Sequence, residues 1–126
     1  MRISESEYHH LLAQSGQPLP QDVQEKRFLA QVVRLARDLG YVAYHVLDSR
    51  GSTAGFPDVV LADPIPSGRR PGGDLPIFMC ELKTQRGKLT HEQELWLRSL
   101  DGKRVVAEIW RPGDMAEIVA RLRGEQ

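Results

Sequence analysis

The chain is poor in cysteine and has no net charge. It contains 126 residues and one cysteine, Cys80, which excludes an internal disulfide framework and a cysteine metal cluster. Its four histidines show no zinc-binding spacing. The 17 Lys and Arg residues balance 17 Asp and Glu residues, whereas proteins that hold duplexes by phosphate contacts are usually basic. A nucleic-acid-binding surface therefore requires local clusters of positive charge.

Long hydrophobic runs are also lacking. No apolar run approaches membrane-spanning length, and the N-terminus has no basic-then-apolar signal pattern, so we expect a cytoplasmic protein with no membrane partner. The length predicts a single domain over residues 1–126. Residues 1–20 are expected to form an N-terminal extension. The proline- and glycine-rich stretch 64–76 is expected to be a flexible insertion loop.

Hydrophobic periodicity and breaker residues predict the order of the secondary structure. Helices are expected at 4–14, 23–39, from 91 onward and at 114–123, and strands at 41–47, 58–62, 76–82 and 104–110. This order predicts an α/β protein with a mixed four-stranded sheet flanked by helices. The first three strands are expected to be antiparallel, and a helical crossover leads to the fourth.

Two carboxylates and an amine are attached to the second and third predicted strands. Asp58 opens one apolar strand, while Glu81 and Lys83 share one face of the next because Leu82 points to the other face. Two carboxylates and the carbonyl of Leu82 are ligands that Mg²⁺ or Mn²⁺ prefers, and such a cation activates water against a phosphodiester. Alternatively, Pro57-Asp58 is an ordinary turn, and Glu-x-Lys is an exposed charge pair. The apolar character of both runs favours the metal site.

Two further polar residues allow both a structural and a functional interpretation. Glu25 lies three residues after Asp22, and Gln93 three residues after Thr90, and each pair fits a helix capping box. Spacing alone does not decide between capping and a role in the acidic site.

The pieces named so far have a family resemblance. Glu25 at the start of EKRFLAQVVRLARDLG, then GFPDVVL, then FMCELKTQRGKLTHEQELWLRSL resemble the PD-(D/E)xK superfamily and, within it, the VRR-NUC (virus-type replication and repair nuclease) group. The resemblance runs from about Glu25 to the end of the chain and leaves out the segment before Gln21. It implies a restriction-endonuclease-like core of order αβββαβ plus terminal helices. The active-site positions that it implies are Glu25, Asp58, Glu81, Lys83 and Gln93, with Glu25, Asp58 and Glu81 as metal ligands.

The expected function is a Mg²⁺- or Mn²⁺-dependent endodeoxyribonuclease that cuts branched DNA, as a dimeric Holliday-junction resolvase. Alternatives within enzymes are a flap, nicking or restriction-like nuclease. A noncatalytic DNA-binding module with the same fold is an alternative of another class. A metal-dependent phosphatase is disfavoured because no histidine joins the acidic set.

Positive and small polar residues on the loops are candidate DNA contacts. The loop between the first two strands offers two of them and the 64–76 loop another two, and the segment after Lys83 supplies the rest. In chain order they are Arg50, Ser52, Arg69, Arg70, Arg86 and Lys88. Taken singly, each of the charged residues is better explained as a solvated surface charge, so the prediction depends on the group and not on any one of them.

Overall fold

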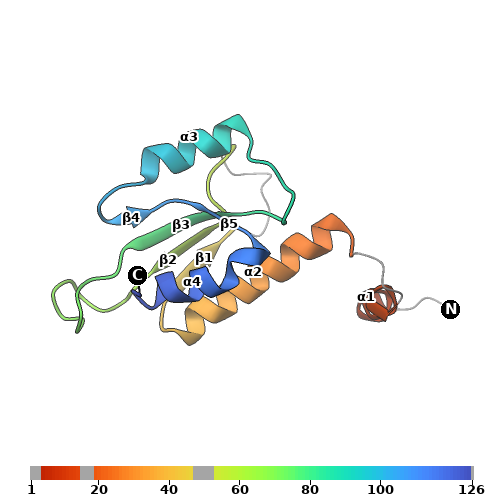
Figure 1. Cartoon of the computed structure of the whole chain (residues 1–126), viewed down its shortest axis with the longest axis horizontal. Helices are drawn as coiled ribbons and strands as arrows, with labels where there is room; N and C mark the ends of the chain where they lie inside the picture. Colours follow the sequence, from red (N-terminus) through yellow and green to blue (C-terminus); the bar gives the residue numbers. More distant parts are fainter. Residues whose placement is uncertain (1–3, 15–18, 47–52, 126) are drawn as a thin grey trace.

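A computed structural model of the chain describes residues 4–14, 19–46 and 53–125. Figure 1 shows a mixed sheet with α2 and α4 on one face and α3 on the other. The helices are α1 (Glu5–Gln14), α2 (Gln21–Asp38), α3 (His91–Leu100) and α4 (Met115–Leu122), the last preceded by a 3₁₀ helix at Pro112–Asp114. The strands are β1 (Val42–His45), β2 (Val59–Ala62), β3 (Ile77–Leu82), β4 (Val105–Val106) and β5 (Ile109–Trp110).

The sheet confirms the predicted mixture of strand directions. Strand β1 pairs antiparallel with β2, and β2 pairs antiparallel with β3. The predicted fourth strand, 104–110, is instead two short strands that both run parallel to β3. The strand is interrupted at Ala107, whose N–H donates to the Asp101 carboxylate at 3.0 Å. Because β5 pairs with Glu81 and Leu82, the split strand still supports the end of β3.

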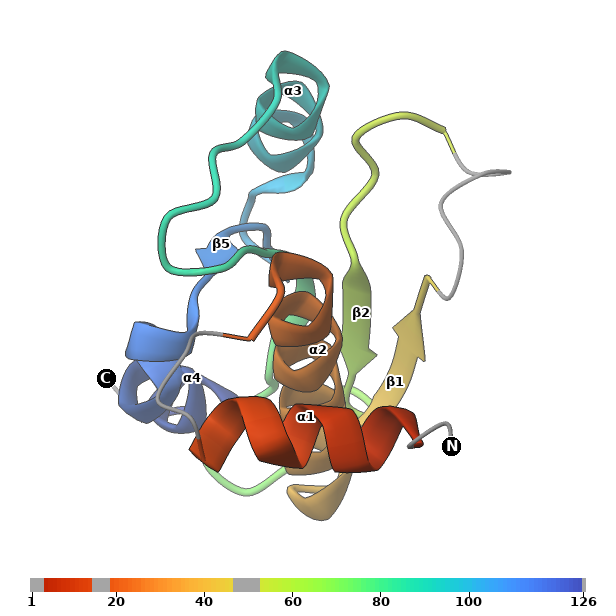
Figure 2. The same ribbon diagram turned by 90° about the vertical axis from the view of Figure 1, so that its right-hand side faces the viewer.

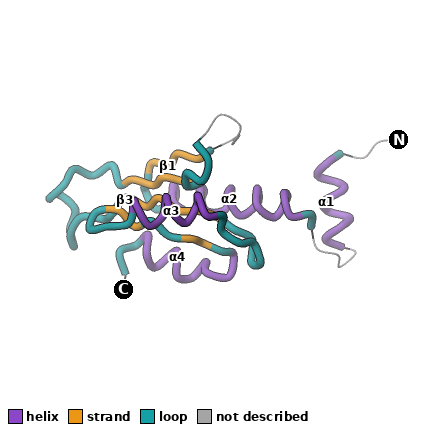
Figure 3. The backbone as a smooth tube through the Cα atoms, turned by 90° about the horizontal axis from the view of Figure 1, so that it is seen from above, coloured by secondary structure: helices purple, strands orange, loops and turns teal. Residues whose placement is uncertain are grey.

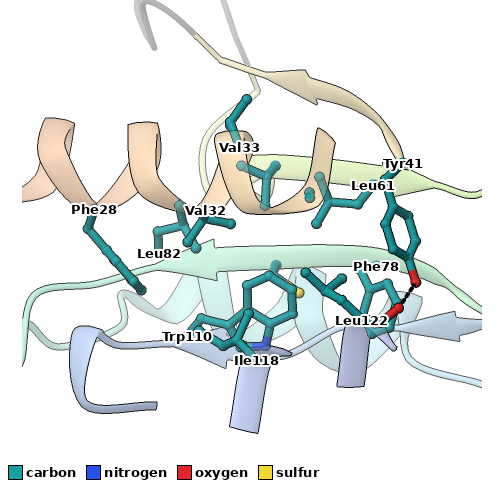
Figure 4. Close-up of a cluster of buried hydrophobic side chains, with 13 residues drawn as sticks. Phe28, Val32, Val33, Tyr41, Leu61, Phe78, Leu82, Trp110, Ile118 and Leu122 are labelled. Atoms are coloured by element: carbon teal, nitrogen blue, oxygen red, sulfur yellow. Dashed lines mark hydrogen bonds between the residues drawn. The ribbon is translucent and has the colours of Figure 1, made fainter. Parts of the chain in front are cut away.

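The main core lies between the sheet and the helices α2 and α4 (Figure 4). In Figure 4, Phe28 of α2 lies beside Leu82 of β3, and Ile118 enters the same cluster from α4. At the other end of the cluster, Phe78 packs edge-on against Tyr41 with ring centroids 5.9 Å apart. The buried hydroxyl of Tyr41 donates to the carbonyl of Leu122 at 2.7 Å. This bond ties the last turn of α4 to the start of β1.

Helix α2 begins two residues earlier than the sequence predicts. Its N-cap is Pro20, and no side chain caps its first turn, so the predicted capping box of Asp22 and Glu25 is wrong. Because the helix already starts at Gln21, Asp22 lies inside the first turn, where its charge complements the helix dipole.

Helix α1 lies apart from the sheet, beyond the N-terminal end of α2 (Figure 3). Its apolar side chains Tyr8 and Leu11 are about half exposed, at 49% and 52%. None of the helices in the described part of the chain combines the length and apolar character needed to cross a bilayer.

Candidate active site

The polar cluster lies where β2 begins and β3 ends. Val59 pairs with Cys80 in the antiparallel register, so the preceding Asp58 is opposite the following Glu81. Alternation along β3 directs Leu82 into the core against α2 and Glu81 to the other face, which α3 covers. The fold therefore brings Asp58 and Glu81 together on one face, as the sequence predicts.

The backbone of Leu82 braces Asp58. The N–H of Leu82 donates to Oδ2 of Asp58 at 2.9 Å. The N–H groups of Glu81 and Lys83 point the other way, to the carbonyls of Glu108 and Trp110. In an extended strand the N–H and C=O of one residue point to the same side, so the Leu82 carbonyl also faces Asp58.

Glu81 is a buried acid that is incompletely satisfied. Its exposed fraction is 4%, and its Oε1 accepts a 2.9 Å hydrogen bond from Nε2 of Gln93. Its Oε2 is buried without a hydrogen-bond partner. Burial first, and then the neighbouring Asp58 carboxylate, raise the pKa of Glu81 to about 9, while Lys83 opposes that rise. Without a cation, the pair of Asp58 and Glu81 therefore holds a proton more tightly than an isolated carboxyl group does.

Gln93 makes a hydrogen bond in keeping with each of the two interpretations of its sequence position, the helix cap and the acidic pair. Its backbone N–H donates to Oγ1 of Thr90, and its Oε1 accepts from the Thr90 N–H at 2.8 Å, so the predicted capping box of α3 is present. Its Nε2 is thereby left to bind Glu81. The helix cap thus orients the amide that holds the catalytic candidate.

A divalent cation fits this pair of carboxylates. The buried Oε2 of Glu81 lacks a partner, Asp58 adds a second negative charge, and the Leu82 carbonyl faces the same place. Mg²⁺ and Mn²⁺ are bound by such all-oxygen sets. Glu25 is exposed and accepts a 3.3 Å bond from Gln21, yet it lies near enough to Glu81 for its negative charge to help raise the pKa of that acid. Across the described ranges, no three or more His, Cys, Asp or Glu side chains form a metal-binding group.

The candidate DNA contacts are distributed over both ends of the sheet. Arg86 and Lys88 are exposed in the segment directly after Lys83. Arg69 and Arg70 lie on the loop between β2 and β3, at the opposite end of the sheet from the acidic pair, and Arg70 forms an ion pair with Asp63. The remaining two candidates, Arg50 and Ser52, lie outside the described residues.

The predicted insertion loop contains polar contacts of its own. Its Asp74 carboxylate accepts bonds from the Ser67 hydroxyl at 2.7 Å and from the Gly68 N–H at 2.9 Å. Flexibility of this loop stays a prediction, since these bonds describe its shape and not its motion.

Sequence reasoning did not identify the residues that support the site from the β5 side. Thr84 is buried just beyond Lys83, the Trp110 carbonyl accepts from the Lys83 N–H, and Arg111 contacts the turn that follows. The only signal in the sequence is the string RPGD directly after the apolar run that ends at Trp110. Nothing in this string indicates that Arg111 contacts the turn after Lys83.

Comparison with known proteins agrees with the geometry. A model of the VRR-NUC domain matches residues 4–111. The match includes the segment before Gln21, which the sequence resemblance left out, and it stops before α4. No curated protein and no solved structure matches the chain.

Proposed function

Because the chain belongs to the VRR-NUC domain family, a family of nuclease domains, we propose that it is a divalent-metal-dependent endodeoxyribonuclease acting on branched DNA. The observation that supports this most is the pair Asp58 and Glu81, together with the buried and unpartnered Oε2 of Glu81. Burying such an incompletely bonded acid disfavours folding, and a bound cation would offset that cost. Lys83, on the same face as Glu81, adds the amine that a phosphodiester site needs.

The contacts support the following roles for the residues of the site. Asp58, Glu81 and the Leu82 carbonyl would hold Mg²⁺ or Mn²⁺, and Glu25 stays a prediction as a further ligand. When bound, the cation would lower the pKa of a water molecule and neutralise charge on the phosphate. Lys83 orients the attacking water or stabilises the charge that develops on the phosphate. Gln93 fixes the rotamer of Glu81 through its amide.

The substrate is proposed to be a branched duplex, cut by a homodimer in the manner of a Holliday-junction resolvase. The described part of the chain contains one such acidic pair, and one site cuts one strand. Two identical copies related by a two-fold axis would present two sites to a four-way junction, and two-fold pairs are the commonest homo-oligomers. Because the chain has no net charge, each subunit is expected to bind DNA with modest affinity. Simultaneous binding by the two subunits of a dimer would compensate for this.

The test is cleavage of labelled DNAs (four-way junction, flap, fork, linear duplex and single strand) with Mg²⁺ or Mn²⁺. Lys83→Ala is expected to lower the rate by about a hundredfold or more while leaving the fold intact. Lys103→Ala is the matched control, because Lys103 is an exposed lysine in the α3–β4 connection and not part of the site. The mass of the protein in solution, measured by light scattering, tests the dimer separately.

Each outcome separates the candidates. Symmetric junction cleavage that is lost in Lys83→Ala supports the resolvase, whereas preferred cleavage of flaps or nicked duplexes identifies one of the other nuclease classes. DNA binding without cleavage under any divalent ion would favour a noncatalytic module.

A further inference from the structure

One arginine holds the turn that follows the catalytic lysine. Nη1 of Arg111, directly after β5, donates to the carbonyls of Thr84 at 2.7 Å and Gly87 at 2.6 Å, with a longer 3.4 Å contact to the carbonyl of Gln85. In Figure 2 the segment between β3 and α3 passes beside β5, where this contact forms. The turn is therefore fixed by a residue from a distant part of the sequence.

A second contact fixes the same turn. Oε1 of Gln85 accepts a 2.9 Å hydrogen bond from the N–H of Gly113 in the 3₁₀ helix. A Cβ atom placed on Gly113 would lie 2.9 Å from that oxygen, and one on Gly87 would lie 3.1 Å from Oγ1 of Thr84. The turn and the 3₁₀ helix are thus packed so closely that side chains on these glycines would displace their neighbours.

The hydrogen-bond partners of Arg111 do not neutralise its positive charge. Its guanidinium binds backbone carbonyls, which are neutral, and forms no ion pair with a carboxylate in the part of the chain that the structure describes. The carbonyls are drawn toward Arg111, while Arg86 and Lys88 of the same segment are exposed. The turn therefore presents two cations outward and has a third behind it, directly after Lys83.

We propose that Arg111 is a positioning residue that holds residues 84–88 in the shape in which Arg86 and Lys88 contact the phosphodiester backbone beside the cleaved bond. The proposal rests on the proposed function, because it assigns a device to the same site. A preformed turn spares the ordering cost that a mobile loop would incur on binding. Arginine suits this task because its planar fork offers several donors in fixed directions, whereas a lysine ammonium ends a flexible stem.

The test is a double-mutant cycle on DNA affinity. In a Lys83→Ala background, which removes cleavage, the Kd for a labelled four-way junction is measured by fluorescence anisotropy at several salt concentrations. We expect Arg111→Gln to weaken binding about tenfold, and Arg111→Lys to restore only part of the loss. In an Arg86→Ala/Lys88→Ala background, Arg111→Gln is expected to have no further effect.

Two controls separate positioning from general stability. Arg121→Gln makes the same charge change and removes an inter-element ion pair to Glu108, but Arg121 does not contact the turn, so its Kd should match the background. Hydrogen exchange should increase at residues 84–88 in Arg111→Gln, while the exchange of the core strands stays unchanged.

An unchanged Kd in Arg111→Gln, or an equal loss with and without Arg86 and Lys88, removes the positioning role. If the wild type binds junctions but cleaves nothing, the proposed nuclease function fails and the cycle still decides the role of Arg111. If the wild type binds no DNA, both fail.

Discussion

At the scale of single residues, Glu81 is placed where folding disfavours a carboxylate. It is buried, faces Asp58 and has one oxygen without a partner. Its pKa is raised from 4.5 to about 9. In the metal-free protein, the contribution of Glu81 to the free energy of unfolding is therefore fully present below about pH 4.5 and is lost as the pH rises toward 9. The site is thus a source of instability that a bound cation would relieve.

Replacing this acid by its neutral isostere should separate stability from activity. Glu81→Gln keeps an oxygen for the amide of Gln93 and removes an acid that must hold a proton in the folded chain although it is ionised in the unfolded chain. It is therefore expected to stabilise the metal-free protein by more than about 1 kcal/mol at pH 8, with little change at pH 4.5. Cleavage should be abolished. Thermal unfolding at the two pH values and the junction assay measure the two effects.

Mg²⁺ provides the complementary measurement. It should raise the Tm of the wild type and not that of Glu81→Gln, since a ligand stabilises the folded state that binds it. Glu117→Gln on the exposed face of α4 is the control and should behave as the wild type. A stabilisation by Mg²⁺ that is equal in the wild type and Glu81→Gln would show that this acid does not hold the cation.

The sequence is sufficient to predict the residues that lie at strand ends and insufficient for those that act across the fold. The meeting of Asp58 and Glu81 could be predicted, because strand alternation and apolar runs are local signals in the sequence. The contacts of Arg111 join residues far apart in sequence, which no periodicity encodes. The distance of Glu25 from the acidic pair depends on how α2 lies against the sheet; its charge acts on Glu81, and its role as a metal ligand stays a prediction.

At the scale of elements, the N-terminus of α3 couples helix capping to the site. Gln93 is both the capping-box residue and the hydrogen-bond donor to Glu81. Two substitutions should separate these roles. Thr90→Ala removes the cap and is expected to lower the free energy of unfolding by about 1 kcal/mol while cleavage persists.

Gln93→Glu should instead retain the helix cap and lower the rate of cleavage. A glutamate still accepts the bond from the Thr90 N–H, so the cap is retained, but it has no amide to donate to Glu81 and adds a third carboxyl group beside the acidic pair. Cleavage is expected to fall by at least about tenfold. Urea unfolding and the junction assay together measure both roles, with Thr90→Ser as the conservative control. Wild-type cleavage by Gln93→Glu would mean that the amide has no part in the site.

The elements also show where local patterns mislead. The run RVVAEIW reads as one strand, but the Asp101 carboxylate takes the N–H of Ala107 and divides it. The Asp-x-x-Glu pattern at Asp22 reads as a capping box, but the helix has already begun at Gln21. In each case the deciding factor, a nonlocal hydrogen bond or the actual first turn, is not a property of the pattern.

At the scale of the whole molecule, the family match and the core have different limits. The match ends at residue 111, yet Ile118 and Leu122 of α4 are buried at 1% and 2% exposure and belong to the main core. The hydrogen bond from Tyr41 to Leu122 adds a polar tie. Helix α4 is therefore required by the fold even though it lies beyond the matched region.

Two truncations test this directly. A chain of residues 1–111 should lose about 4 kcal/mol or more of stability and its cooperative thermal unfolding, because two core side chains are removed and their neighbours are exposed. A chain of residues 19–126 should unfold cooperatively with a Tm close to that of the full chain, since the described side chains of α1 are not part of the main core. Cooperative unfolding of residues 1–111 would contradict the role given to α4.

Because β5 follows β3 and α3 in the chain, the surroundings of the acidic pair are completed late during synthesis. Glu81 emerges from the ribosome well before Ile109 and Trp110, the strand that flanks it on its second side, and before Arg111, which holds the following turn. A nascent chain that ends between them has its acidic pair, but the end of β3 lacks its parallel neighbour. The proposed nuclease site is therefore completed only once β5 and Arg111 have been synthesised, so that an incomplete product would present no finished site to the nucleic acids around it.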